Sequence, residues 1–509
     1  MSSTQNIAKN SLFLYLRMFL NMLVSMFTAG IVLNTLGISD YGIYNVVGGF
    51  VALFSFLNGS MSSATQRFLS FDLGKGDFIQ LKKTFSTTVT IHWAIAILIL
   101  FLLESVGLWY VNYKLNVPQE RLQAVNIIFQ FSIFSTFLSI IQVPYNALIT
   151  AHERFNVFAY ISFLEIGFKI LILYLLIRIS GDKLVLYAGM LFISSFIVRG
   201  IYRIYCNREF PESKYQFYFN KAYFNTLLTY TGWNLFGNIA FVAKTHGNNL
   251  VLNVFFGTSL NAAYGITAMF QGIVSSFVSN FQTAVNPQII KSYASGDVQR
   301  SIKLIQQSSK FSFGLMLVIA MPILLSTKFI LDTWLKNYPY QSVLFVQLCL
   351  INILIDTISN PIMFGLQATG KIKAYQSVVG ILLFLNLPIS YLLIMYIDEP
   401  AIIFYVSIFI SVLALGCRLY FLKIQMGISL MNYFKNTFSR IAALTLVSVV
   451  IFYVLVNLDF SFHSIVKFIL LTVFAIFLTL LFSYIILLNR KEKKLFAGFI
   501  HSKFKLQRK

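Results

Sequence analysis

Several long stretches of this sequence carry almost no charge, and this feature restricts the possible folds more than any other. Residues 85–111 contain only Glu104 and His92 as acidic or basic side chains, and residues 376–397 contain none. A helix needs about 20 apolar residues to cross the roughly 30 Å hydrocarbon core of a bilayer. A membrane β-barrel would instead show alternating segments of about 10 residues. The sequence therefore predicts an all-α polytopic membrane protein.

The composition agrees with a chain that lies mostly in lipid. Hydrophobic residues make up 58% of the chain and charged residues 11%, whereas a soluble domain carries roughly 25% charged residues. The apolar runs predict fourteen transmembrane helices. The expected spans are 11–36, 42–66, 85–111, 122–148, 157–179, 184–206, 226–254, 260–287, 309–332, 342–367, 376–397, 400–423, 440–457 and 464–489.

Lysine and arginine fall mainly in alternate loops of this topology. If both termini are cytoplasmic, 30 of the 39 basic residues lie on the cytoplasmic side and seven lie outside. Loops rich in Lys and Arg stay in the cytoplasm during insertion. The net charge of +22 then lies on one face, where anionic lipid headgroups account for it and nucleic acid is not needed. We therefore expect a multi-pass protein of the cytoplasmic membrane with both termini inside and contacts to membrane lipids.

The two halves of the chain repeat short motifs at a nearly constant offset. VPYNALITAHERF (143–155) is matched by NPIMFGLQATGKI (360–372), and GKGDFIQLKK (74–83) by SGDVQRSIK (295–303). Spans one to six and seven to twelve therefore indicate a duplicated six-helix unit, and such halves in transporters meet around a central site near the membrane midplane. The predicted parts are an N-terminal lobe (1–222), a pseudo-symmetric C-terminal lobe (223–425) and an additional helix pair with a basic tail (426–509).

A proline occupies the same place in both copies of the first motif. Pro144 and Pro361 lie near the predicted cytoplasmic end of the fourth helix of each half. Proline removes a backbone hydrogen bond and ends or kinks a helix. Two hypotheses follow, namely that the prolines are bending points for alternating access or that they simply terminate the helices.

Polar residues recur at helical spacing on the first two helices of each half. Polar groups are costly against lipid, so these stripes should face protein or water. Hydrogen bonding between helices is the alternative to a shared aqueous cavity. A cavity lined in this way would suit a hydroxyl-rich solute. The predicted substrate-binding residues are Arg17, Asn21, Ser25, Asn58, Asn234, Asn238, Lys244, Gln271 and Gln282.

Three ionisable residues in the spans bear on mechanism. Arg17 and Lys244 are costly at membrane depth, so an anionic group such as a phosphate is an expected partner, although Arg17 could also snorkel to the interface. Asp356 in span ten is a candidate coupling carboxylate, and a structural, hydrogen-bonded acid is the alternative. The histidines and the three cysteines have no ligand spacing, and no long extramembrane segment could hold an active site. We expect no catalytic residue, metal or cofactor.

At this point the sequence resembles a known group of transporters. The segment LGISDYGIYNVVGGFVALFSFLNGSMSSATQRFLSFDLGKGD (36–77) is similar to the opening two-helix segment of the O-antigen and capsular repeat-unit flippases (Wzx type). PYNALITAHERF (144–155) is similar to the end of their fourth helix. These flippases belong to the multidrug/oligosaccharidyl-lipid/polysaccharide exporter superfamily. The resemblance covers spans one to twelve.

The resemblance implies a flippase that moves polyprenyl-pyrophosphate-linked oligosaccharides from the inner to the outer leaflet of the bacterial cytoplasmic membrane, alongside the polysaccharide polymerase and chain-length machinery. Arg17 and Lys244 could then supply a cationic cavity for the pyrophosphate. Two alternatives stay open. A cation-coupled multidrug antiporter of the same fold should place acids in the cavity, and a membrane glycosyltransferase or polymerase should carry paired carboxylates or a sizeable outer loop.

Overall fold

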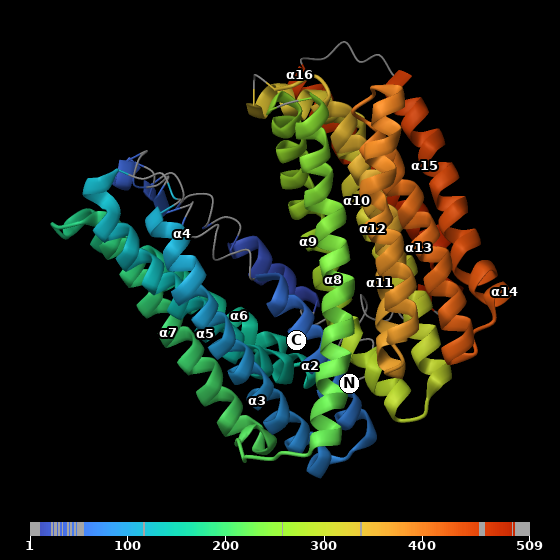
Figure 1. Ribbon diagram of the computed structural model, residues 1–509. Coiled ribbons are helices and arrows are strands. Elements are labelled where there is room, and N and C mark those ends of the chain that lie inside the picture. The colour runs from blue at the N-terminus through green and yellow to red at the C-terminus, as the bar shows by residue number, and fades with distance from the viewer. Residues whose placement is uncertain are drawn as a thin grey trace, which may run out of the picture. The chain divides into compact units, whose positions relative to one another are not determined.

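The structure is a computed structural model, which describes residues 11–21, separate positions between 24 and 47, and residues 55–113, 115, 118–256, 258–335, 338–457, 464–490, 492 and 493. All regular structure in this part of the chain is helical (Figure 1). The main helices are α2 (Ser55–Lys75), α3 (Phe78–Leu102), α4 (Leu108–Tyr113), α5 (Leu122–Ala151), α6 (Phe155–Arg178), α7 (Lys183–Glu209), α8 (Lys221–Phe256), α9 (Thr258–Ala294), α10 (Val298–Leu335), α11 (Ser342–Thr369), α12 (Lys373–Ile397), α13 (Ile402–Met426), α14 (Leu430–Tyr433), α15 (Ser439–Asn457) and α16 (Ser464–Phe482).

Eleven helices in the described part of the chain are long and apolar enough to cross a membrane. They match eleven of the fourteen predicted spans, so the protein is a multi-pass α-helical membrane protein. The predicted spans 11–36 and 42–66 are described only in part, with gaps between residues 21 and 55. The span predicted at 226–254 is present as α8 but does not reach the same hydropathy. Its asparagines and Lys244 lower the mean hydropathy. These side chains make the polar contacts described below.

The chain forms two compact units. The N-terminal unit contains residues 1–239 and 290–296, and the C-terminal unit contains residues 240–289 and 297–509. The boundary therefore falls inside α8, and a short piece at the end of α9 belongs to the N-terminal unit. The lobe boundaries expected from the repeat, at residues 222 and 425, stay a prediction.

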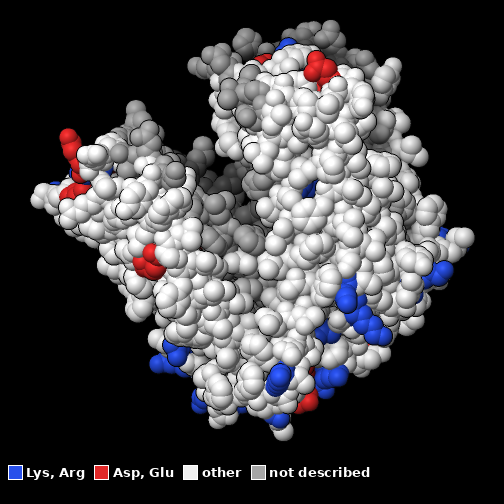
Figure 2. All heavy atoms as spheres, viewed as in Figure 1, with Lys and Arg blue, Asp and Glu red and all other residues white. Residues whose placement is uncertain are grey.

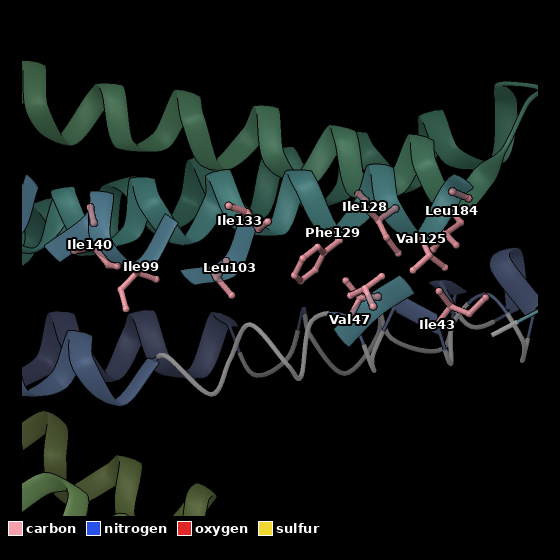
Figure 3. Close-up of a cluster of buried hydrophobic side chains, with 14 of the residues drawn as sticks. Ile43, Val47, Ile99, Leu103, Val125, Ile128, Phe129, Ile133, Ile140 and Leu184 are labelled. Atoms are coloured by element: carbon pink, nitrogen blue, oxygen red, sulfur yellow. The ribbon is translucent and has the colours of Figure 1, made fainter. Parts of the chain in front are cut away.

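The core of the N-terminal unit shows how the apolar runs are used. Val125, Phe129 and Ile133 on α5 are fully buried, at spacings that place them on one helix face. They pack against Ile99 of α3 and against Leu103, which directly follows α3 (Figure 3). α5 also contacts α2 and α7, so it is the central helix of this unit. In the C-terminal unit α11 has the corresponding place, because it packs against both α10 and α13.

The duplicated motifs adopt the same local structure in both copies. Gly76 and Gly296 have φ angles of 72° and 86°. The next residue in each case caps a helix, since Asp77 Oδ1 accepts from Gln80 N at 2.9 Å and Asp297 Oδ1 accepts from Arg300 N at 3.0 Å. Only glycine adopts the left-handed conformation without strain, and an aspartate N-cap satisfies a free N–H of the first turn. The sequence repeat therefore corresponds to a structural repeat.

The structure corrects one hypothesis about the duplicated prolines. Pro144 lies inside α5 and Pro361 inside α11, and these helices continue to Ala151 and Thr369. Neither proline terminates its helix, because the helix continues for seven residues beyond Pro144 and eight beyond Pro361. The helix ends lie instead next to residues with positive φ, namely Glu153 at 60° and Gly370 at 78°. The role of the prolines as bending points stays a prediction.

The visible face of each unit is largely uncharged, and most of its Lys and Arg side chains gather toward the lower part of the view (Figure 2). This distribution gives a direct test of orientation. Lys75 is exposed between α2 and α3, and Tyr340 is 88% exposed between α10 and α11. In a Cys417→Ser background, Lys75→Cys should be shielded from an impermeant maleimide in intact cells and Tyr340→Cys should react. The native Cys206 and Cys349 are buried and should not be labelled by the maleimide. The reverse labelling pattern would overturn the cytoplasmic assignment of the termini.

Candidate functional site

A buried polar cluster in the C-terminal unit contains three of the predicted functional residues. Lys244 on α8, Gln271 on α9 and Asp356 on α11 line the same cavity of about 30 Å³, together with Asn352 and Ser407. This volume holds about one or two water molecules. The structure thus brings the candidate coupling acid and a candidate cation into one place.

The Lys244 ammonium group is held by the neighbouring helix α13. Its Nζ donates to Ser411 Oγ at 2.8 Å and to the Ser407 carbonyl at 3.3 Å, and the side chain is 5% exposed. The carboxylate of Asp356 acts on Lys244 electrostatically, as does the positive charge of Arg418. The cluster of Lys244, Asp356 and Arg418 therefore carries one more positive than negative charge when all three groups are ionised.

Hydrogen bonds fix the positions of the acid and of Arg418. Asn352 Nδ2 donates to Asp356 Oδ2 at 3.2 Å, one helical turn away on α11. Arg418 Nη1 donates to Ser359 Oγ at 2.5 Å, and Arg418 Nε is buried without a partner among the described residues. An unpaired buried donor is costly. Such a donor can bind a water molecule or an anionic oxygen.

A second network adjoins Lys244 on α8. Asn248 Nδ2 donates to Ser407 Oγ at 3.0 Å, and Asn386 Nδ2 donates to Asn248 Oδ1 at 3.0 Å. Ser407 Oγ donates to Asn386 Oδ1 at 3.1 Å. All three side chains are buried, so this triangle joins α8, α12 and α13. It fixes the register of the helix that carries Lys244.

Gln282 on α9 forms hydrogen bonds to two other helices. Its Nε2 donates to Ser312 Oγ at 3.0 Å and to the Thr357 carbonyl at 3.1 Å, and its Oε1 accepts from Asn360 at 3.3 Å. These contacts join α9, α10 and α11. They agree with the alternative of interhelical hydrogen bonding for this residue.

The predicted residues of the N-terminal unit form separate contacts. Asn58 Nδ2 donates to Ser139 Oγ on α5 at 3.2 Å. Asn234 and Asn238 on α8 donate to the carbonyl and hydroxyl of Ser60, at 3.2 and 2.8 Å. Each of these asparagines therefore links two helices.

Arg17 lies on the first helical segment and is partly exposed. Its Nε donates to Ser162 Oγ at 3.1 Å, and its guanidinium carbon lies 5.2 Å from the centre of the Phe158 ring. No ion pair found between described residues includes Arg17. Asn21, one turn further, is also partly buried, and Ser25 lies outside the described residues. The guanidinium is thus positioned by a hydroxyl group and a ring, neither of which neutralises its charge.

Sequence reasoning missed three arginines in the predicted spans. Arg418 lies in the predicted span 400–423, and its charge interacts with that of Asp356 in the C-terminal unit. Arg199 and Arg203, one turn apart on α7, line a large cavity in the N-terminal unit. Their spacing of four residues inside an apolar run could have indicated a shared face.

No family model and no curated protein sequence matches this chain, but solved structures do. An outward-facing multidrug resistance MATE family transporter of the MOP superfamily matches with a TM-score of 0.71 at 12% identity, over 84% of this chain and 96% of that one. A MOP superfamily transporter from Pyrococcus furiosus, described as having a binding pocket of reverse polarity, gives 0.70 at 12% identity, over 84% and 96%. A Vibrio cholerae MATE transporter in the bent form gives 0.67 at 15%, over 84% and 98%. This chain therefore has the fold of the MATE-like transporters of the MOP superfamily.

Proposed function

We propose that this protein is a flippase that moves polyprenyl-pyrophosphate-linked oligosaccharides from the inner to the outer leaflet of the bacterial cytoplasmic membrane. The glycan would be a repeat unit for lipopolysaccharide O-antigen, capsule or exopolysaccharide, which a polymerase and chain-length proteins then extend. The observation that carries the proposal is the setting of Arg17. A guanidinium in the first membrane helix is positioned by Ser162 and Phe158 and has no ion pair with a carboxylate among the described residues.

An arginine in this setting favours an anionic ligand. Its planar group offers two parallel N–H donors that match a phosphate, whereas a lysine offers a point charge. Because Nε is used by Ser162, the guanidinium plane is fixed before a ligand arrives. A pyrophosphate would supply the negative charge that no described carboxylate provides to Arg17. Lys244 contacts α13 in the C-terminal unit, and its role toward the pyrophosphate stays a prediction.

A cation-coupled multidrug antiporter is the second candidate, because one of the matching structures is a multidrug transporter. Asp356 is the residue that would serve it, since an intramembrane carboxylate can bind a proton or a cation. In this chain, however, two cations act on or beside that carboxylate. Net positive charge disfavours binding of a cationic drug there.

Leaflet localisation of the lipid-linked glycan tests the proposed function. Depletion of the protein should cause the complete lipid-linked repeat unit to accumulate in the inner leaflet, where an impermeant glycosidase or lectin cannot reach it in intact cells. An antiporter would leave glycan localisation unchanged and alter drug tolerance. A glycosyltransferase would leave the lipid-linked unit incomplete, which mass spectrometry of extracted lipids distinguishes.

Arg17→Ala is expected to lower export of the lipid-linked glycan at least about tenfold, because a charge-assisted hydrogen bond to a phosphate contributes about 1.5–3 kcal/mol. Arg17→Lys should keep part of the activity, since the charge remains while the paired donors are lost. Ser162→Ala is a matched control that frees Nε but retains the guanidinium, so its effect should be smaller. Export can be measured by surface labelling per molecule of folded protein. Normal export by Arg17→Ala would exclude this residue from the pyrophosphate site.

A further inference from the structure

The N-terminal unit contains a cavity of about 510 Å³ between α3, α5 and α7. It is lined by residues between 89 and 93 of α3, between 138 and 145 of α5, and between 196 and 203 of α7. In the predicted spans 85–111, 122–148 and 184–206 these residues lie in the half that the basic loops assign to the cytoplasm. Its lining combines two arginines with aromatic and polar side chains. These include Thr90 and Trp93 from α3, Gln142 and Tyr145 from α5, Arg199, Gly200 and Arg203 from α7, and Tyr215 from the following loop.

The two arginines present a fixed donor pair to this cavity. Arg199 Nη1 donates to the carbonyl of Ser135 at 2.7 Å, which orients its guanidinium. Arg203, one turn later on the same helix, acts on the Tyr145 hydroxyl through its charge and a hydrogen bond. Neither arginine belongs to an ion pair found between described residues. Two positive charges thus lie at one cavity, and no carboxylate among the described residues forms an ion pair with either.

The rim of the cavity is apolar and aromatic. Trp93 is 44% exposed and Phe196 is 59% exposed, and both line the cavity. Tryptophan and tyrosine side chains favour the depth at which the hydrocarbon core meets the headgroups. Exposed aromatic side chains next to two arginines suit an amphipathic molecule. Its acyl chain would lie against the aromatic side chains, and its charged group would contact the arginines.

The loop that closes one side of the cavity is held in place by its own contacts. Tyr215 shares a hydrogen bond of 3.2 Å with Thr90, and Glu212 contacts His152 at 2.5 Å. Burial raises the pKa of Glu212, but the hydrogen bond from His152 and a backbone N–H lower it more, so the pKa lies below its ordinary value. Glu212 is therefore ionised at neutral pH and ties the loop to the end of α5. The cavity is formed before any ligand binds.

We propose that this cavity is a binding site for the phosphate headgroup of a membrane lipid, contacted by Arg199 and Arg203. Basic pockets between transmembrane helices near the cytoplasmic face are suited to anionic headgroups, and guanidinium groups bind phosphate oxygens in pairs. The lipid supplies the negative charge that the two arginines lack. This inference is independent of the proposed transport activity, because a transporter of any substrate can hold such a lipid.

Native mass spectrometry of the purified full-length protein in detergent tests the site. The protein is titrated with phosphatidylglycerol, with undecaprenyl phosphate and with diacylglycerol, which shares the acyl chains of a phospholipid but has no phosphate. The wild type should bind one or both phosphorylated lipids and not diacylglycerol. Arg199→Gln combined with Arg203→Gln should weaken this binding at least about tenfold. Arg178→Gln, at an exposed arginine at the end of α6, is the matched control and should bind like the wild type.

Gly200→Leu provides a second variant that retains both arginines. A Cβ atom at Gly200 meets no atom within 4 Å, and leucine favours a helix over glycine, so the variant should fold. Because the leucine projects into the cavity, it should also weaken binding of the phosphorylated lipid. Preference for phosphatidylglycerol would assign a resident phospholipid, and preference for undecaprenyl phosphate would assign a polyprenyl lipid. Wild-type affinity in both the double arginine variant and Gly200→Leu would overturn the proposal, as would equal binding of diacylglycerol.

Discussion

Asp356→Asn is expected to destabilise the C-terminal unit by about 1–3 kcal/mol, because loss of the carboxylate leaves nearby positive charge less compensated. Asp356 is the carboxylate that acts on both Lys244 and Arg418. The substitution keeps the size of the side chain and its contact with Asn352, so the main change is the loss of negative charge. Thermal unfolding of the detergent-solubilised protein should show a clear decrease in Tm.

A second substitution shows whether charge is the cause. Lys244→Met in the Asp356→Asn background removes one of the two unbalanced cations, so the double variant should be more stable than Asp356→Asn alone. Asp398→Asn is the matched control, because Asp398 is exposed and has a φ of 50°, a conformation that asparagine tolerates well. Strictly additive effects of the two cluster substitutions would show that Lys244 and Asp356 do not interact.

The same variants separate the two roles proposed for Asp356. If the carboxylate is structural, the double variant should recover export together with stability. A coupling carboxylate must gain and lose a proton or cation during the cycle. In that case the double variant would be stable but inactive, while Lys244→Met alone would retain activity. Export per folded molecule, measured at a temperature where both variants are folded, distinguishes these outcomes.

Gly74→Ala is expected to disrupt the contact between α2 and the end of α9 inside the N-terminal unit. A Cβ atom at Gly74 would lie 2.6 Å from the carbonyl oxygen of Lys291 and 2.8 Å from the Cβ of Ala294. The carbonyl belongs to a helix backbone, so it cannot rotate away as a side chain would. Overpacking of this kind destabilises a protein by about 1–3 kcal/mol. Because the oxygen cannot move away, we expect a destabilisation near the upper limit of this range. Lys291 Nζ also donates to Glu153 Oε1 at 2.7 Å, and this ion pair should be strained or lost.

Gly59→Ala on the same helix is the control for this prediction. A Cβ atom there meets nothing within 4 Å, and alanine is favoured over glycine in a helix by up to about 1 kcal/mol. Gly59→Ala should therefore leave Tm unchanged or raise it, while Gly74→Ala lowers it. Hydrogen exchange of the peptide covering residues 290–296 should become faster in Gly74→Ala alone. Equal behaviour of the two variants would show that the close approach at Gly74 is not needed for stability.

The sequence by itself determined the helices and their repetition, because both depend on local features. Long uncharged runs specify membrane spans through the cost of placing charge in lipid, so eleven of the predicted spans recur as helices. The turns at Gly76–Asp77 and Gly296–Asp297 are encoded by adjacent residues, and they have the same geometry in both halves. A proline inside a helix is not decided locally. Pro144 and Pro361 could end a helix or be accommodated inside it, and the structure shows the second outcome for both.

Tertiary structure alone decided which polar residues meet. A stripe at helical spacing shows that Asn58 or Gln282 avoids lipid, but its partner lies on another helix and depends on how the helices pack. For the same reason Lys244 and Asp356, far apart in the sequence, line one small cavity. Arg199 and Arg203 form a site only because α3 and α5 enclose the space beside them. Lipid requires only that a polar group be shielded, and the packing of helices determines whether a hydrogen bond, an ion or a ligand does so.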